Sequence, residues 1–188
     1  MISIAIPVYE MKNKDFFLER CLDSIRIQSY QDWEIVITEK GKMAKNTNEA
    51  LKQSTGDLIK VLFMDDYFAH KDALKNIVES FTGNWLITGC DTNPHPYWTD
   101  DIITGNNKLG SPSCLTIKNG LGMYFDESMS WLLDCDFYKR MNDKYGIPTI
   151  LDSVNVNIGI HDGQATNILT DKEKQNEHKY LYEKYPIK

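Results

Sequence analysis

The chain has 188 residues, of which 41% are hydrophobic, and this suits one globular domain with its own core. The formal net charge of -6 argues against a nucleic-acid-binding protein, because phosphate backbones require clustered Lys and Arg. The four cysteines form no closely spaced pair, which favours buried thiols over a zinc or redox framework. No apolar run reaches transmembrane length, so we expect a soluble, cytoplasmic protein that could work at a membrane surface through partners.

Strands and helices alternate through the first 90 residues. Near-continuous apolar runs predict buried strands at residues 2–8, 33–37, 58–64 and 85–88. Apolar residues at helical spacing predict helices at residues 17–25, 44–53 and 73–81. Alternation with short links predicts an α/β fold with a mostly parallel central sheet flanked by helices. Ligands of such sheets bind at the carboxyl ends of the strands.

The second half changes character. Residues 90–113 are rich in Pro, Gly, Asn and Asp and predict a long loop over the site, with 91–107 as a candidate lid. Further predicted elements are strands at 114–118 and 123–125, a helix at 131–142, an extended stretch at 149–160 and a charged helix at 171–185. We therefore expect a single domain with a nucleotide-binding half (1–90), an acceptor and catalytic half (91–170) and a helical tail (171–188).

Asp65 and Asp66 directly follow the third predicted strand. Two adjacent carboxylates after a buried strand are costly unless a partner satisfies them, and Mg²⁺ or Mn²⁺ does so with oxygen ligands. The alternative is a turn and helix cap before the helix near Lys71, and the sequence leaves both interpretations open.

Two other clusters carry candidate side chains. His161, between an extended run and a glycine, could complete a metal shell, although a single His is more often structural. Asp134 and Asp136 lie near a predicted helix start and cannot share one helix face. One could cap the helix while the other serves as a general base in a cleft. No dinucleotide-binding, phosphate-loop or nucleophile-elbow motif is present, which weakens dehydrogenase, ATPase and serine hydrolase assignments.

In order along the chain, these segments resemble the family 2 glycosyltransferases with the GT-A fold. The resembling segments are residues 3–9, 18–25, 28–30, 33–37, 46–50, 55–57, 63–66, 110–113 and 125–127, and 134–136 with Arg140. The resemblance implies an inverting, metal-dependent transferase that moves a sugar from a nucleotide-diphosphate donor to an acceptor hydroxyl, with Mn²⁺ or Mg²⁺. UDP-sugars are favoured, GDP-sugars remain open, and the acceptor would be a glycan, a lipid-linked molecule or a protein. A homodimer is compatible with this class.

The resemblance also implies roles for individual residues. Asp134 is similar to the family's catalytic base, and Asp66 and His161 to its metal ligands. The remaining expected contacts are with the donor nucleotide, from Pro7, Val8, Tyr9, Glu39, Asn46 and Asp65. Acceptor or sugar contacts are expected from Trp98, Ser113, Trp131 and Asp136, although aromatic residues that pack in loops and core are an equally good interpretation of the tryptophans.

One departure from the family keeps a second function open. Many members carry an acidic D-D-x-S motif after the second strand, where this chain has Thr38-Glu39-Lys40-Gly41. Glu39 could substitute for the acidic residue that contacts the nucleobase. The alternative function is a non-catalytic relative that binds a nucleotide or a glycan. A nucleotidyltransferase is disfavoured, because residues 9–12 are not a Gly- and Arg-rich phosphate loop.

Overall fold

The structure is a computed structural model that describes residues 1–186. The last two residues of the predicted tail lie outside this range. Within it, the chain forms one seven-stranded sheet in the order β2-β1-β3-β6-β5-β7-β4. The strands are β1 (Ile2–Pro7), β2 (Trp33–Thr38), β3 (Leu58–Val61), β4 (Tyr67–Phe68), β5 (Trp85–Cys90), β6 (Leu115–Lys118) and β7 (Thr149–Asn157). The α-helices are α1 (Lys14–Arg26), α2 (Met43–Gln53), α3 (Ala73–Ser80), α4 (Leu133–Tyr145), α5 (Ala165–Ile168) and α6 (Asp171–Lys184).

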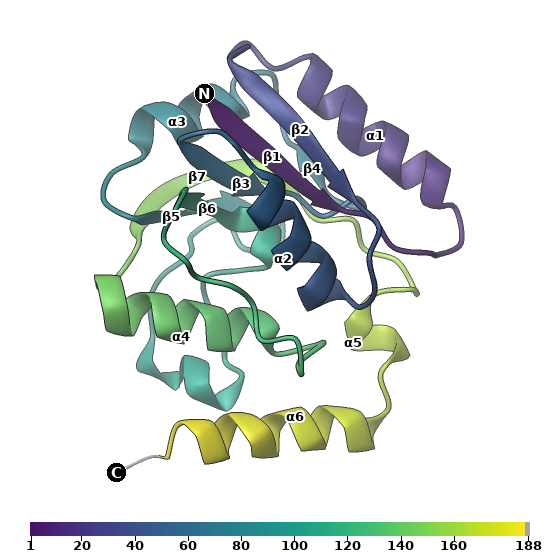
Figure 1. The fold of residues 1–188 in the computed structure, drawn as a ribbon, viewed down its shortest axis with the longest axis vertical. Helices are drawn as coiled ribbons and strands as arrows, with labels where there is room; N and C mark the ends of the chain where they lie inside the picture. The colour runs from purple at the N-terminus through teal and green to yellow at the C-terminus, as the bar shows by residue number, and fades with distance from the viewer. Residues whose placement is uncertain (187–188) are drawn as a thin grey trace.

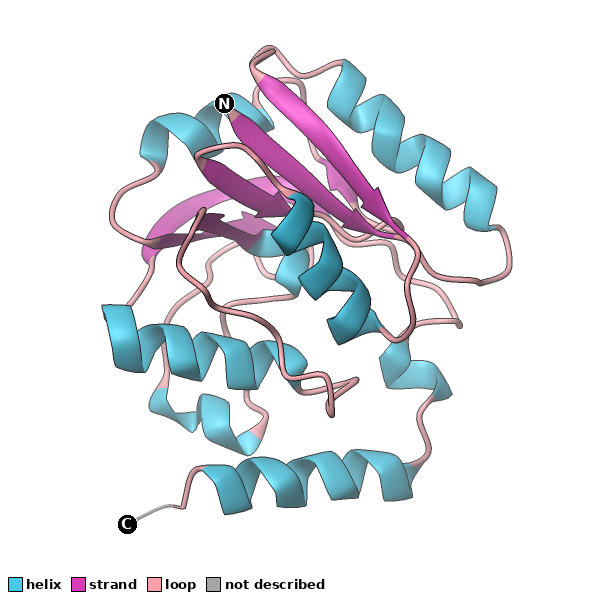
Figure 2. Ribbon diagram, in the orientation of Figure 1, coloured by secondary structure: helices cyan, strands magenta, loops and turns pink. Residues whose placement is uncertain are grey.

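The sheet is mixed and mostly parallel (Figures 1 and 2). β1 pairs in parallel with β2 and β3, and β5 with β7, whereas β6 and β4 run antiparallel to their neighbours. The chain moves from β1 to β2 in one direction and from β2 to β3 in the other. Right-handed crossovers therefore place α1 and α2 on opposite faces of the sheet.

β1 lies between β2 and β3, and its apolar residues suit this buried position. All six residues of β1 are buried, as expected for a strand covered on both faces. On one face α1 and α3 are joined through Gln28, whose amide donates to the His70 carbonyl and accepts from the Leu74 amide, each at 2.8–2.9 Å. On the other face α2 packs against β1 and β2.

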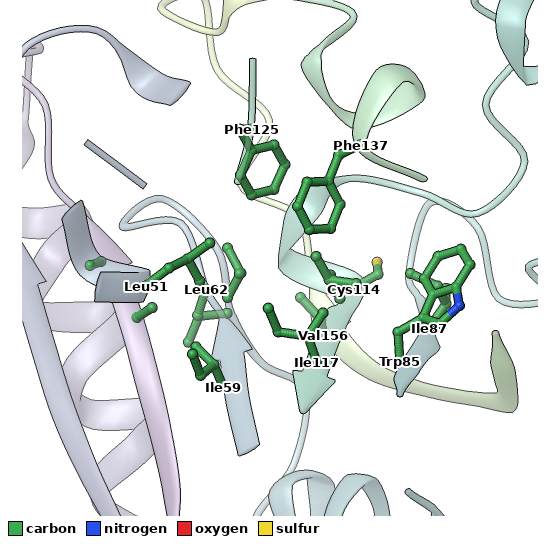
Figure 3. Close-up of a cluster of buried hydrophobic side chains, with 14 of the residues drawn as sticks. Leu51, Ile59, Leu62, Trp85, Ile87, Cys114, Ile117, Phe125, Phe137 and Val156 are labelled. Atoms are coloured by element: carbon green, nitrogen blue, oxygen red, sulfur yellow. The ribbon is translucent and has the colours of Figure 1, made fainter. Parts of the chain in front are cut away.

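The core continues from the sheet to α4. Figure 3 shows Phe125 and Phe137 above Leu62, which follows β3, Cys114, which precedes β6, and Val156 of β7. The two rings stack with centroids 4.3 Å apart. This contact joins the second half of the chain to the sheet, so one core serves both halves. All four cysteines are buried and free.

Two expectations about local structure were wrong. The strand predicted to run to Met64 ends at Val61, because the Phe63 amide donates to the Ser113 hydroxyl (2.8 Å) instead of a strand. Residues 123–125 form no strand, since the Phe125 amide pairs with the side chain of Asn48 (2.7 Å). The loop at 90–113 contains 3-10 turns at Asp100–Thr104 and Pro112–Cys114.

Across residues 1–186, none of the helices combines the length and the apolar character that a membrane span requires.

Candidate active site

The carboxyl ends of β2, β1 and β3 lie side by side and form one edge of the site. Just after β1, the Val8 amide donates to the last carbonyl of β2 (2.8 Å). Asn46 of α2 secures this edge, because its amide donates to the Val8 carbonyl (2.7 Å) and accepts from the Lys40 amide (2.8 Å). Asn46 thus fixes the backbone segments that carry Tyr9 and Glu39.

Asp65 and Asp66 occupy the turn after β3 and are only 5% and 3% exposed. Asp66 Oδ1 accepts the Gly159 amide at 2.8 Å. Burial, reinforced by the charge of Asp65, raises the pKa of Asp66 above its usual value. Asp65 Oδ1 is buried and has no hydrogen-bond partner in the described part of the chain. Buried carboxylates with an unsatisfied oxygen are stabilised by added positive charge.

His161 reaches the same pair from the segment after β7. Its Nε2 lies 2.8 Å from Asp65 Oδ2, and its Nδ1 accepts the Gly163 amide at 3.1 Å. Because Nδ1 accepts a hydrogen bond, Nε2 carries the proton and donates to Asp65. The ring packs on Phe17, with centroids 4.9 Å apart. This segment requires glycine at Gly159, where an added Cβ would lie 2.0 Å from the Asp65 carbonyl oxygen.

Arg20 supports the Asp65–Asp66 turn and was not among the residues singled out from the sequence. One terminal nitrogen donates to the Asp65 carbonyl at 2.5 Å, and the guanidinium lies 4.3 Å from the centroid of the Tyr67 ring. Arg20 therefore holds the backbone of the turn rather than a ligand. The available signal was an arginine on the same face of a helix as Phe17 and Cys21.

The opposite wall is formed by the amino-terminal end of α4. Asp134 lies there, with Oδ2 accepting from the Asn107 amide (2.7 Å) and Oδ1 from the Cys135 backbone amide (2.8 Å). Burial raises the pKa of Asp134, and these two hydrogen bonds partly offset the rise. A raised pKa brings a carboxylate closer to the range in which a general base works near neutral pH.

Asn107 is the second residue that sequence reasoning missed. Besides Asp134, its amide nitrogen donates to the Gly110 carbonyl (2.8 Å), and its oxygen accepts the backbone amides of Leu109 (2.8 Å) and Gly110 (3.2 Å). All these contacts fix the orientation of the side chain relative to Asp134. An asparagine in a Gly-containing loop normally indicates only a turn, so no local signal pointed to this role.

The two walls enclose a cleft of about 150 Å³. Five of the site residues predicted from the sequence line this cleft, namely Tyr9, Asp65, Asp66, Trp131 and Asp134. A larger cavity of about 540 Å³, within the size range of small-molecule sites, adjoins it and shares Tyr9 and Met43. A third hollow of about 290 Å³ is lined by Val8, Tyr9, Glu39 and others. Tyr9 is common to all three, so they form one connected surface.

The remaining candidates lie outside the cleft. Asp136 is fully buried and is bonded to Arg140, Lys184 and Tyr185 at 2.7–2.8 Å, so it serves a packing network. The indole N–H of Trp98 donates to Asp100 (3.1 Å), and Trp98 is not among the residues that line the cleft.

Three further candidates support the cleft from behind. Ser113 is buried beneath the Asp65–Asp66 turn, and its hydroxyl accepts the Phe63 amide. Pro7 and Asn46 are likewise buried, at the edge formed by the carboxyl ends of β2, β1 and β3.

The Asp65–Asp66 pair carries carboxylate oxygens of the kind that bind a divalent cation. Within residues 1–186, no cluster of three or more His, Cys, Asp or Glu side chains is arranged as a complete metal site. The unpartnered Oδ1 of Asp65 and the carboxylate of Asp66 nevertheless offer hard oxygen donors, whereas both ring nitrogens of the adjacent His161 are engaged in hydrogen bonds.

The sheet has a carboxylate pair at its central edge, and a third carboxylate lies across the cleft. This arrangement is typical of the GT-A class of folds. The chain belongs to glycosyl transferase family 2, whose family model matches residues 3–101. No curated protein matches the chain significantly.

Solved structures show the same fold. The UDP complex of TarS 1–349 from S. aureus superposes with a TM-score of 0.65 and 18% identity, covering 86% of this chain and 61% of that one. A mannosyltransferase from Pyrobaculum calidifontis in complex with GDP-Man and Mn²⁺ gives 0.62 and 17%, covering 86% and 57%. A Drosophila galactosyltransferase with manganese and UDP-Gal gives 0.54 and 12%, covering 93% and 78%. The chain thus spans less than two thirds of the TarS 1–349 chain.

Proposed function

We propose that this protein is an inverting, metal-dependent glycosyltransferase that moves a sugar from a nucleotide-diphosphate donor to an acceptor hydroxyl. The observation that carries the proposal is the placement of Asp65 and Asp66 on one wall of a cleft and Asp134 on the other. The first wall lies at the strand ends where α/β sheets bind nucleotides. Family membership makes sugar transfer the chemistry to test on this pair of walls.

Asp65, Asp66 and His161 would hold the metal. A divalent cation there would neutralise the charge of the departing nucleoside diphosphate, which is otherwise a poor leaving group. To coordinate through Nε2, His161 would have to give up its hydrogen bond to Asp65, because the donating nitrogen has no free lone pair. Tyr9 lies beside this pair, and burial followed by the charge of Asp65 raises the pKa of its hydroxyl, which therefore stays protonated and able to donate.

Asp134 is proposed as the base that removes the proton of the acceptor hydroxyl. The hydroxyl oxygen would attack the anomeric carbon from the side opposite the diphosphate, which gives a single displacement with inversion. This chemistry requires one carboxylate base, unlike the paired carboxylates of glycoside hydrolysis. Asn107 keeps Oδ2 of Asp134 in a fixed orientation while leaving other lone pairs free to accept a proton.

The hollow beside Tyr9 favours uracil or guanine as the donor base. Glu39 and Lys14 line it as an ion pair, so a carboxylate acceptor and an ammonium donor face the same space. Uracil and guanine present a ring N–H beside a carbonyl and complement this pair, as thymine also does, whereas cytosine has an acceptor nitrogen beside an amine. TarS was solved with UDP and UDP-GlcNAc, and the Pyrobaculum enzyme with GDP-Man, which supports the same two bases.

The acceptor, the cytoplasmic location and a homodimeric state remain part of the proposal. A glycan, a lipid-linked molecule or a protein would each offer the hydroxyl that the reaction needs. The larger cavity has apolar walls from Met11, Met43, Ile168 and Leu169, and it is the space next to the cleft in which an acceptor could lie.

The test is calorimetric titration of UDP, GDP, CDP and dTDP, each with and without Mn²⁺. The proposal predicts Mn²⁺-dependent binding of UDP or GDP and weaker binding of CDP. Release of the nucleotide from UDP-GlcNAc or GDP-mannose then separates the transferase from its alternative, a non-catalytic relative. The alternative is motivated by the Thr38–Gly41 segment and predicts nucleotide binding without turnover. Absence of nucleotide binding by a folded sample would contradict the transferase and favour a non-catalytic relative that binds a glycan.

A further inference from the structure

Glu177 of α6 makes an unusual contact with the wall of the cleft. Its carboxylate accepts three consecutive backbone amides, those of Ser130 (2.7 Å), Trp131 (2.8 Å) and Leu132 (2.8 Å). Glu177 lies more than 40 positions further along the chain, so the contact is tertiary and not part of a local turn. Carboxylates that accept several backbone amides form strong, directional contacts.

This contact lies just before a helix start that has no side-chain cap. Leu132 is the N-cap residue of α4, and its side chain has no oxygen that could accept the first amides of the helix. The carboxylate of Glu177 accepts the amide of Leu132 itself and those just before it. Its negative charge lies near the amino-terminal end of α4, where the helix dipole favours an anion.

α6 holds Trp131 by its side chain as well. The rings of Trp131 and His178 meet edge to face with centroids 5.2 Å apart, and Lys174 Nζ lies 5.6 Å from the centroid of the indole. Together with Glu177, these contacts fix both the backbone and the ring of Trp131, which lines the cleft with Asp134.

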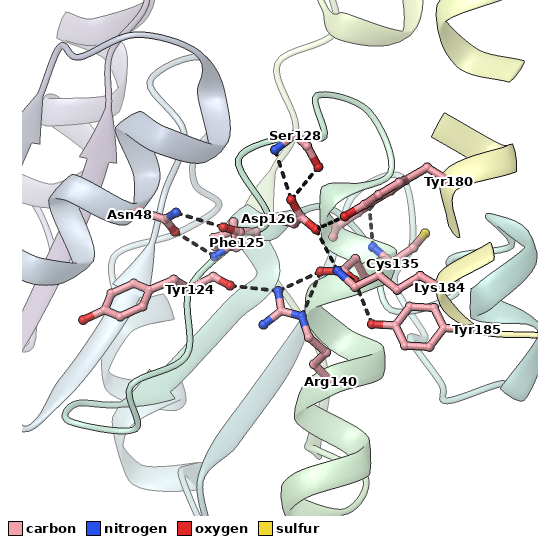
Figure 4. Close-up of polar contacts among 12 residues, drawn as sticks. Asn48, Tyr124, Phe125, Asp126, Ser128, Cys135, Arg140, Tyr180, Lys184 and Tyr185 are labelled. Carbon is pink, nitrogen blue, oxygen red and sulfur yellow. Dashed lines mark hydrogen bonds and ion pairs between the residues drawn. The ribbon is translucent and has the colours of Figure 1, made fainter. Parts of the chain in front are cut away.

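α6 is capped at its start and anchored to the rest of the chain at its far end. At its start, Thr170 and Glu173 form a capping box, which stabilises the first turn of the helix. At its far end, Lys184 bonds Asp126, as Figure 4 shows, and also Asp136, each at 2.7 Å. These contacts hold the helix that carries Glu177, so the contact of Glu177 becomes part of the support for the cleft.

We infer that Glu177 is a positioning residue of the proposed transferase, setting the Ser130–Leu132 segment so that Trp131 and Asp134 face the donor wall. The inference rests on the proposed function. It goes beyond the family match, because residues 3–101 contain neither α4 nor α6. In physical terms, a displacement of about 1 Å in a catalytic group can lower the rate by about 100-fold.

Glu177→Gln is the variant that tests this role. Glutamine keeps the size of the side chain but has a single acceptor oxygen, so its NH₂ group would face at least one of the three backbone amides. The matched control is Glu183→Gln on the same helix, where the glutamate is exposed and lies 3.7 Å from Lys179.

Two readouts are needed. The first is hydrogen exchange of the backbone amides of residues 130–136, which we expect to be at least about 10-fold faster in Glu177→Gln and unchanged in Glu183→Gln. The second is Mn²⁺-dependent release of UDP from UDP-GlcNAc and of GDP from GDP-mannose. For Glu177→Gln we expect kcat to fall by about 10- to 100-fold with the donor KM within about twofold, since the donor wall is untouched.

The outcomes separate the inference from the function on which it rests. Wild-type exchange rates in Glu177→Gln would overturn the inference whether or not the protein has activity. Faster exchange with unchanged kcat would also overturn it, because Glu177 would then be structural only. A wild-type protein with neither turnover nor Mn²⁺-dependent nucleotide binding would refute the proposed function, and the exchange rates would still decide whether Glu177 holds the segment.

Discussion

The two walls of the cleft are built in different ways. The donor wall, with Tyr9, Asp65 and Asp66, follows directly from strands β1 and β3 in the buried centre of the sheet. The wall that carries Trp131 and Asp134 lies at a helix start, and it is held by Asn107 and Glu177 from distant parts of the chain. The donor wall therefore lies at the ends of core strands and is held by polar contacts from Arg20, Gly159 and His161, whereas the catalytic wall lies at a helix start and is held by Asn107 and Glu177. Substitutions should separate binding from turnover accordingly.

The largest expected effect is on the catalytic wall alone. Asp134→Asn removes the proposed base and should lower nucleotide release or transfer by about 100- to 10,000-fold, the usual contribution of a general base. Nucleotide affinity should stay within about twofold, because Asp134 lies across the cleft from the donor wall. Asp143→Asn, on the exposed face of the same helix, is the control. A comparable loss of nucleotide affinity in Asp134→Asn would end the separation of the two walls.

The complementary substitution removes the donor wall's charge. Asp66→Ala should abolish the Mn²⁺-dependent part of UDP or GDP affinity, with a loss of about 10- to 100-fold in the calorimetric titration. The physical reason is that the buried pair loses one of two carboxylates available to the cation. Asp101→Asn, an exposed position in the 3-10 turn, should leave affinity unchanged. Unaltered Mn²⁺-dependent affinity in Asp66→Ala would remove Asp66 from the metal site.

A smaller effect should come from the support of Asp134. Asn107→Ala should lower kcat by about 10-fold through loss of orientation. The Asn107 hydrogen bond favours the ionised form of Asp134, so its loss should raise the pKa of that carboxyl further. The acid limb of the pH–kcat/KM profile should then move to higher pH. A limb in the wild-type position would show that Asn107 does not act on Asp134.

The anchoring network of α6 should affect stability more than binding. Burial opposes ionisation of Asp126, but Lys184, Ser128 and Tyr180 outweigh it and hold its pKa well below the usual value. A depressed folded-state pKa contributes stability above the unfolded pKa and loses it as pH falls.

Asp126→Asn should therefore cost about 1–3 kcal/mol at pH 7, the range for hydrogen bonds to charged groups. The difference from wild type should shrink below about pH 4, near the pKa of an unfolded Asp. The free energy of unfolding of both proteins, measured with denaturant at pH 7 and below about pH 4, tests this expectation. A difference that stays constant with pH would contradict the charged state assigned to Asp126.

The smallest effect is expected at the base pocket. Glu39→Gln keeps the shape of the side chain but removes its negative charge. The substitution therefore weakens the ion pair with Lys14 and the hydrogen bond that position 39 would accept from an N–H group of the base. We expect only a few-fold loss of UDP or GDP affinity, because the Glu39 side chain is exposed and solvent screens charged contacts of this kind. Titration of CDP in parallel is the check. A larger loss for CDP than for UDP and GDP would contradict the proposed base contact.

The same contrast between the walls explains how much could be predicted from the sequence. The strand before Asp65 and the apolar run at residues 2–8 predicted the fold and the position of the donor edge, since buried strands have a local signature. The family and the GT-A fold were confirmed. The roles assigned to Asp66, Asp134 and His161 stay predictions.

The catalytic wall was harder to predict for a physical reason. Asn107 and Glu177 act through contacts with residues at least 27 positions away, as Arg20 does at the donor wall, and no local pattern indicates such partners. Asp136 shows the opposite error, because the family resemblance suggested an acceptor contact, whereas Arg140 and Lys184 hold it in the interior. Polar side chains with tertiary partners are therefore where sequence reasoning falls short.

The most direct test of the account is a calorimetric titration of UDP and GDP into wild type and Asp134→Asn, with Mn²⁺ and with a chelator. We predict binding of one of the two nucleotides only with Mn²⁺ and with equal affinity in both proteins, because the donor wall holds the nucleotide without Asp134. Absence of Mn²⁺-dependent binding in folded wild type, or its loss in Asp134→Asn, would contradict the account.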